Sequence, residues 1–126
     1  MKKISKILVP VDGSVNGCKA VDYAIFLAEK SEAKLDFVYV ASSINKDIPS
    51  DIVFDKIWGK IPAHIIAEKH IENGNIPRAI IKVAEQCQSD MIVMGSRGLG
   101  ILKGALIGSV SQKVTEESKC PVMVVK

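Results

Sequence analysis

The apolar residues of this chain fall into two alternating kinds of segment. Short runs that are apolar throughout are typical of strands buried on both faces of a parallel sheet. Such runs occupy residues 7–11, 91–94 and 121–125, and the segment 35–40 is apolar except for Asp36. Between the first of these runs and the segment 35–40, apolar residues recur with helical spacing at Val21, Ala24, Ile25 and Ala28. Strands that alternate with helices predict a parallel sheet with right-handed crossovers.

The ends of the helices can be predicted from capping residues. Ser14 or Asn16 is available to cap the first helix. Ser50 and Asp51 predict the start of a short second helix, which would bury apolar residues between positions 53 and 61. Ser109 with Gln112 matches a capping box, so the last helix should begin there.

Residues 65–72 fit either a strand or a helix. A strand is the better interpretation because the turn residues Asn73, Gly74 and Asn75 end the segment. Pro77 then suits the first turn of the next helix. That helix would present its apolar side through residues between positions 80 and 87.

Together these segments predict an α/β fold. Residues 1–126 should form one domain around an open parallel sheet of about five strands, with the order 3-2-1-4-5 and helices on both faces. In that Rossmann-like order, a crevice opens at the carboxyl ends of the first and fourth strands. The segments Asp12-Gly13 and Gly95-Ser96 should line it.

Composition limits the classes of function. Hydrophobic residues make up 48% of the 126 residues, but only 5% are aromatic, which leaves little material for stacking nucleic-acid bases. The net charge is only +3, and the basic residues are scattered singly along the chain. No stretch approaches the length of a membrane span, and the apolar run after Lys6 is too short for a secretory signal. We therefore expect a cytoplasmic protein with no nucleic-acid or membrane partner.

The cysteines and histidines do not form a metal-binding motif. Cys18, Cys87 and Cys120 lie far apart without a C-x-x-C pair, which indicates a reducing compartment. His64 and His70 are the only histidines, so a zinc site is not expected, and any other metal is left undetermined.

A glycine-rich segment carries the clearest chemical signal. Gly95 and Gly98 follow a buried strand, and Gly108 with Ser109 precedes a helix. Backbone N–H groups at a helix start lack intrahelical partners, and glycine lets a phosphate approach them. Arg97 could add a positive charge. Glycines after a strand can equally make a simple turn, which alone would explain the first two.

The spacing Gly95, Gly98, Gly108, Ser109 resembles the G-x2-G-x9-G-[ST] motif of nucleotide-binding universal stress proteins. Residues 7–14, 90–98 and 120–125 also resemble that family's first, fourth and last strands. The resemblance implies the adenine nucleotide alpha hydrolase-like fold and a site for ATP, AMP or another adenine nucleotide, with Mg²⁺. The implied binding residues are Pro10, Val11, Asp12, Val40, Met94, Gly95, Arg97, Gly98, Gly108, Ser109, Val110 and Ser111. Asp12 can alternatively cap a turn.

The resemblance favours an ATP-binding regulatory protein of the stress response that acts as a switch, with slow or no hydrolysis and no catalytic residue assigned. A weak ATPase is an alternative, but the chain lacks the lysine of a G-x4-G-K-[ST] loop. A phosphoacceptor receiver domain is disfavoured, because Asp12 is followed by Gly13-Ser14 instead of further acidic residues. A dimeric signalling module that needs no nucleotide also stays open.

We also expect a homodimer through the terminal strand, since residues 121–125 are apolar on both faces and would lie at the sheet edge. A protein partner is expected but cannot be identified.

Overall fold

A computed structural model describes residues 3–43, 48–97 and 108–126. These residues form five strands and four helices in alternation. In chain order they are β1 (Lys6–Pro10), α1 (Val15–Ser31), β2 (Lys34–Ala41), α2 (Ser50–Trp58), β3 (Ala67–Asn73), α3 (Ile76–Cys87), β4 (Met91–Gly95), α4 (Ser109–Glu117) and β5 (Val122–Val125). No helix in this part of the chain is long and apolar enough to cross a membrane.

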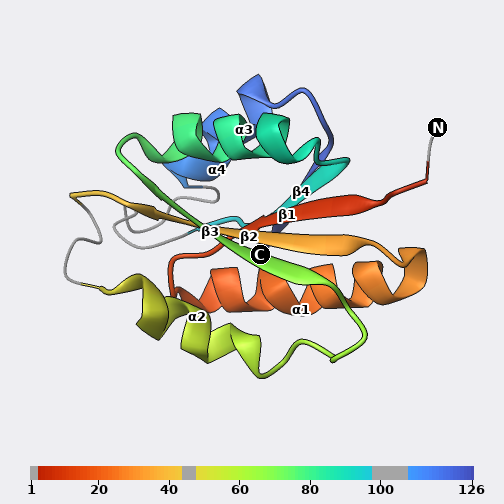
Figure 1. Ribbon diagram of the computed structural model, residues 1–126. Helices are drawn as coiled ribbons and strands as arrows, with labels where there is room; N and C mark the ends of the chain where they lie inside the picture. The colour runs from red at the N-terminus through yellow and green to blue at the C-terminus, as the bar shows by residue number, and fades with distance from the viewer. Residues whose placement is uncertain (1–2, 44–47, 98–107) are drawn as a thin grey trace.

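The strands form one parallel sheet with the order β3-β2-β1-β4-β5. This confirms the predicted order and fold class. The sheet lies between two helical layers, with α1 and α2 on one face and α3 and α4 on the other (Figure 1). Because all strands are parallel, their carboxyl ends share one edge of the sheet, where the predicted crevice lies.

Burial along the strands explains why their sequences are apolar. The three inner residues of β1 and the six inner residues of β2 are buried, as expected for strands covered on both faces. Successive side chains point to opposite faces. Phe37 and Tyr39 therefore pack in the core beneath α1 and α2, whereas Val38 and Val40 pack in the core beneath α3 and α4.

Two helix starts are as predicted. The Ser14 hydroxyl accepts a hydrogen bond from the Gly17 N–H at 3.1 Å, which caps α1. Asn75 caps α3 by accepting from the Arg78 N–H at 3.0 Å, and Pro77 lies in the first turn. The strand interpretation of residues 65–72 is also confirmed, since β3 occupies most of that range.

The predicted caps of the other two helices are wrong. Ser50 is already helical in α2, and Pro49 precedes it without a side-chain cap. Likewise Ser109 is the first residue of α4, after an extended Gly108. A residue with helical backbone angles cannot cap its own helix in the way that an extended residue does. The capping box is therefore absent, although α4 does begin at Ser109.

The carboxyl end of β4 lies directly against the start of α1. A Cβ atom added to Gly95 would stand 2.7 Å from the Asn16 carbonyl carbon and 2.9 Å from the Gly17 nitrogen. Both neighbours are backbone atoms that cannot rotate away. The side-chain amide of Asn16 also donates to the Ser96 hydroxyl at 3.1 Å. Glycine is therefore the residue that fits at position 95.

We predict that Gly95→Ala destabilises the fold by about 1–3 kcal/mol, because the new methyl group forces β4 and α1 apart. The free energy of unfolding in urea measures this change. Gly59→Ala is the matched control, because a Cβ there meets no atom within 4 Å. The control should change stability by less than about 0.5 kcal/mol. Equal stability of the two variants would contradict the close approach at Gly95.

Candidate functional site

The turn after β1 forms one wall of the expected crevice. Gly13 has a φ of +86°, a conformation that favours glycine. The Asp12 carboxylate accepts a hydrogen bond from the Ser14 N–H at 2.8 Å. Asp12 therefore caps this turn, which is one of the two roles considered for it. Its contact with a nucleotide stays a prediction.

The structure joins the two halves of the glycine motif at the end of β4. The Gly108 N–H donates to the Ser96 carbonyl oxygen, with 2.6 Å between nitrogen and oxygen. The Ser111 hydroxyl donates to the Gly95 carbonyl oxygen, also at 2.6 Å. These bonds hold the start of α4 beside the end of β4. Gly98, the second glycine of the motif, lies outside the described residues.

The start of α4 has no side-chain cap. Gly108 precedes the helix, and no side chain caps its first turn. The first backbone N–H groups of a helix point outward with the positive end of its dipole. Ser109 is exposed there, but Ser111 is buried and its hydroxyl proton is used in the bond to Gly95. Ser111 thus has a structural role in this conformation.

The other predicted site residues do not form one surface. Val11 and Val40 are both buried, but in cores on opposite faces of the sheet. Met94 is buried in the same core as Val40, and Pro10 is half-buried at the end of β1. Arg97 is exposed. The role of Val11 and Val40 as nucleotide-binding residues therefore stays a prediction.

Tyr39 closes the α2 side of this region. Its hydroxyl donates to the Ile48 carbonyl oxygen at 2.7 Å. Burial, and to a smaller extent the negative charge of Asp12, raise the pKa of the Tyr39 phenol. The phenol therefore stays protonated at neutral pH and remains a hydrogen-bond donor.

A cleft of about 470 Å³ lies beside the start of α4, at the carboxyl edge of the sheet. Its walls come from the segments that follow β2 and β3, from the first turn of α3 and from α4 along its length. The lining residues are Ser42, Ser43, Gly74, Asn75, Ile76, Pro77, Arg78, Ser109, Val110, Lys113 and Glu117. Arg78 and Lys113 give this cleft two cationic side chains.

Sequence reasoning found only Ser109 and Val110 among these lining residues. A signal for the others was available, because all parallel strands end at the same edge. The residues after β2 and β3, including Ser42 and Asn75, must therefore lie near those after β1 and β4. Lys113 carried no such signal, since its place depends on how α4 packs.

The sheet order and the switch in chain direction between β1 and β4 define an open, doubly wound α/β protein of the Rossmann-like class. Comparison with known families is more specific. The model of the universal stress protein family matches residues 3–55 and 59–126. This chain belongs to the universal stress protein family. The universal stress protein YxiE of Bacillus subtilis is 31% identical to it, over 97% of this chain and 99% of that protein.

Solved structures show the same fold. The universal stress protein UspA from Lactobacillus plantarum matches all of both chains, with a TM-score of 0.80 and 22% identity. A family member from Arabidopsis thaliana with AMP bound matches 97% of this chain and 91% of its own, with a TM-score of 0.74 and 22% identity. A universal stress protein in complex with cAMP matches 99% of both chains, with a TM-score of 0.71 and 24% identity.

We predict that Ser111→Ala lowers the free energy of unfolding by about 1–2 kcal/mol, because the Gly95 carbonyl oxygen loses its short hydrogen bond in a buried place. Denaturant unfolding measures the change. Ser109→Ala is the matched control two residues away, on the exposed side of the same helix turn. If the control proves as destabilised as Ser111→Ala, the loss does not come from the bond to the Gly95 carbonyl oxygen, and the structural role of Ser111 is wrong.

Proposed function

We propose that this protein binds an adenine nucleotide at the carboxyl edge of its sheet and acts as a nucleotide-dependent regulatory switch. The start of α4 is the single observation that carries the proposal. It presents backbone N–H groups that no side chain caps, beside a cleft with two cationic side chains. Two structural neighbours, which hold AMP and cAMP, support an adenine nucleotide as the ligand.

The phosphates would bind at the first turn of α4. The N–H of Gly108 already donates to the Ser96 carbonyl oxygen, so the N–H groups that follow it would contact the anion, and Gly108 has no side chain to block them. Lys113 lies one turn further along the helix and lines the same cleft, as does Arg78 from the start of α3. Arg78 and the helix dipole would compensate the charge of a phosphate group, together with Lys113, which also pairs with Glu117 at 3.1 Å.

The size of the cleft suits a small ligand. Its volume of about 470 Å³ lies within the roughly 300–1,000 Å³ typical of small-molecule sites. Of the adenine nucleotides, we propose ATP with Mg²⁺. Glu117 is the carboxylate among the described lining residues, so phosphate oxygens and water would supply most Mg²⁺ ligands.

The proposed role is binding with slow or no hydrolysis. Efficient phosphoryl transfer requires a cation on the transferred oxygens and a residue that orients the attacking water. The chain has no G-x4-G-K-[ST] lysine. In the described part of the cleft, Glu117 is the one carboxylate that could serve as a base, and Lys113 already pairs with it at 3.1 Å.

We predict saturable binding of Mg-ATP in calorimetric titration of the folded protein, with one site per chain. Lys113→Glu should weaken it about tenfold or more, because it replaces a charge-assisted contact with repulsion. Gly108→Val should abolish binding, because a branched side chain would block the approach of phosphate to the backbone. AMP and cAMP, titrated in parallel, identify the preferred nucleotide.

Lys30→Glu is the matched control for charge reversal. Lys30 is exposed in the last turn of α1, which ends at the opposite edge of the sheet from the cleft. The control should bind like the unmodified protein. Absence of binding heat at millimolar nucleotide, with circular dichroism showing a folded chain, would refute the proposal. Unchanged affinity in Lys113→Glu and Gly108→Val would place the site elsewhere.

We also propose a homodimer that pairs through β5, which would serve a signalling role with or without nucleotide. The carbonyl oxygens of Pro121 and Val125 accept hydrogen bonds from Ile92 and Ser96. Since backbone groups alternate in direction along a strand, the N–H and C=O groups of Val122 and Val124 point away from β4. An apolar edge of this kind invites pairing with a second copy.

We predict that Val124→Pro shifts the protein from dimer to monomer in sedimentation at micromolar concentration. The substitution removes an N–H that points out of the sheet, a position where an edge strand tolerates proline. The monomer should therefore stay folded. Val124→Thr keeps the N–H and should remain dimeric. A stable monomer of the unmodified chain would show that β5 does not form the dimer interface.

A further inference from the structure

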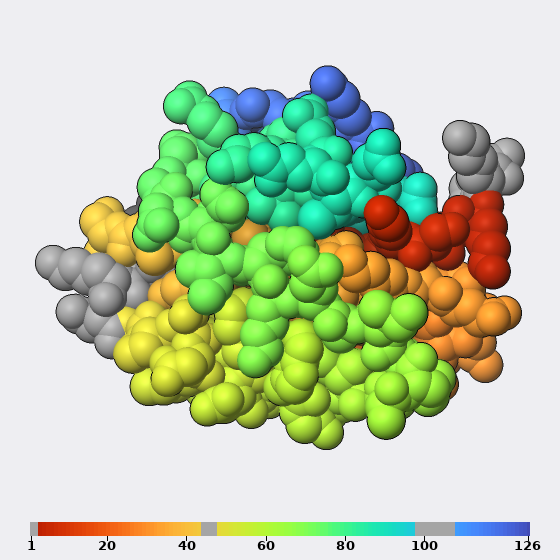
Figure 2. All heavy atoms as spheres, in the orientation of Figure 1, coloured from red at the N-terminus to blue at the C-terminus, as the bar shows by residue number. Residues whose placement is uncertain are grey.

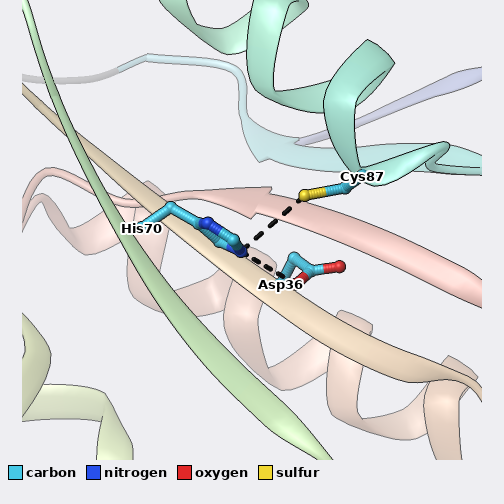
Figure 3. Close-up of side chains that lie close together, drawn as sticks. All are labelled: Asp36, His70 and Cys87. Atoms are coloured by element: carbon cyan, nitrogen blue, oxygen red, sulfur yellow. Dashed lines mark hydrogen bonds and ion pairs between the residues drawn. The ribbon is translucent and has the colours of Figure 1, made fainter.

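A second group of chemically active side chains lies away from the carboxyl edge. Asp36, His70 and Cys87 each place one potential ligand atom within 4.8 Å of the other two. Nε2 of His70 is 2.9 Å from Oδ1 of Asp36 and 3.7 Å from Sγ of Cys87. Figure 3 shows the three side chains pointing toward one another from two strands and a helix end.

The fold brings these residues together from three elements. In the register of β2 and β3, Asp36 pairs with Glu68 and Val38 pairs with His70. Because strand side chains alternate, Asp36 and His70 share the sheet face that α3 covers. Cys87 is the last residue of α3 and packs against the core on that face. β3 is an edge strand on the near side of the molecule, so the group lies close to the surface (Figures 1 and 2).

The Asp36 carboxylate has an unusual environment. It is fully buried, and its Oδ1 is shared by His70 and by the Lys34 ammonium, which lies 3.2 Å away. Its Oδ2 is also buried and has no hydrogen-bond partner. Buried carboxylate oxygens are costly unless a donor or a cation compensates them. Oδ1 is thus already in contact with two donors, whereas the buried Oδ2 is still available as a ligand for a cation.

We propose that Asp36, His70 and Cys87 bind a divalent transition-metal ion of the zinc type. One thiolate, one imidazole nitrogen and one carboxylate oxygen are the three donor types that Zn²⁺ takes in proteins. Nε2 of His70 lies 2.9 Å from Oδ1 of Asp36 and 3.7 Å from Sγ of Cys87, and all three ligand atoms lie within 4.8 Å of one another. Neighbouring ligands around a tetrahedral ion with bonds of about 2.0–2.3 Å are about 3.3–3.6 Å apart. Small side-chain movements suffice.

The charges around the group fit such an ion. A divalent cation is neutralised by the Cys87 thiolate and the Asp36 carboxylate, and the thiol proton leaves to solvent as the sulfur–metal bond forms. Lys34 is already paired with the Glu68 carboxylate at 2.9 Å and can remain so. Glu68 also lies 3.7 Å from the His70 ring, so its carboxylate or a water can occupy the fourth position.

A catalytic triad explains this geometry less well. In a triad, the carboxylate and the nucleophile contact opposite nitrogens of the histidine ring. Here Asp36 and Cys87 both contact Nε2. Burial, with a smaller contribution from Asp36, also raises the pKa of the Cys87 thiol, the reverse of nucleophile activation. Convergence of all three atoms on one point is the arrangement that a metal ion requires.

Cobalt(II) titration of the metal-free, reduced full-length protein tests the proposal. One equivalent should produce the near-ultraviolet charge-transfer absorption of a cobalt–thiolate bond, and zinc should displace it. Cys87→Ser should remove this absorption and weaken binding by more than about tenfold, and His70→Gln should weaken binding by a similar factor. Cys87→Ala is a second thiol variant, and circular dichroism establishes that each variant is folded.

The chain provides matched controls for both variants. Cys120→Ser changes a free, half-buried cysteine outside the group, and His64→Gln changes an exposed histidine. Both should bind cobalt like the unmodified protein. The proposal is overturned if the folded, unmodified protein gives no thiolate absorption with excess cobalt, or if that absorption survives in Cys87→Ser and Cys87→Ala.

Discussion

Much of the carboxyl edge depends on the close approach of Gly95 to the backbone of α1. Because position 95 has no side chain, β4 can end against the Asn16 and Gly17 backbone. The next residue, Ser96, then donates its N–H to Val125 in β5 and accepts from Gly108 before α4. Four elements therefore meet within two residues, and their mutual placement sets the cleft beside α4.

Helix α3 contributes residues to both of the sites that we propose. Its first turn lines the cleft, through residues 76–78, and its last residue is Cys87. The helix has 12 residues, and a helix rises about 1.5 Å per residue, so its ends lie about 17 Å apart. The same buried stripe of Ala79, Ile80, Val83 and Ala84 holds both ends against the sheet. The packed face of α3 therefore places the proposed anion site at one end of the helix. It places the proposed metal ligands at the other end.

The sheet order could be predicted from the sequence because short apolar runs alternate with helical segments, a pattern typical of a doubly wound parallel sheet. The sequence was not sufficient for the caps at Ser50 and Ser109, since capping depends on the backbone angles of a residue as well as on its type. The absence of zinc was expected from two isolated histidines. That reasoning overlooked that register and helix packing bring Asp36 and Cys87 to His70 from 34 and 17 positions away. The spacing of these three residues along the chain does not indicate that they lie close together.

The glycines of the motif meet two different requirements, close packing and access to backbone N–H groups. The sequence pattern alone does not show which glycine meets which requirement. Gly95 is required by packing, because a Cβ would collide with the backbone of α1. Gly108 precedes a helix start without a side-chain cap and is adjacent to the cleft-lining Ser109, where access to backbone N–H groups favours a small residue. Ser111, just beyond the motif, holds these two positions together through the Gly95 carbonyl oxygen. Gly108 also contributes to the fold, because it is buried and its N–H donates to the Ser96 carbonyl oxygen. A change at position 95 therefore acts on packing alone, whereas a change at position 108 acts both on packing and on the phosphate site that we propose.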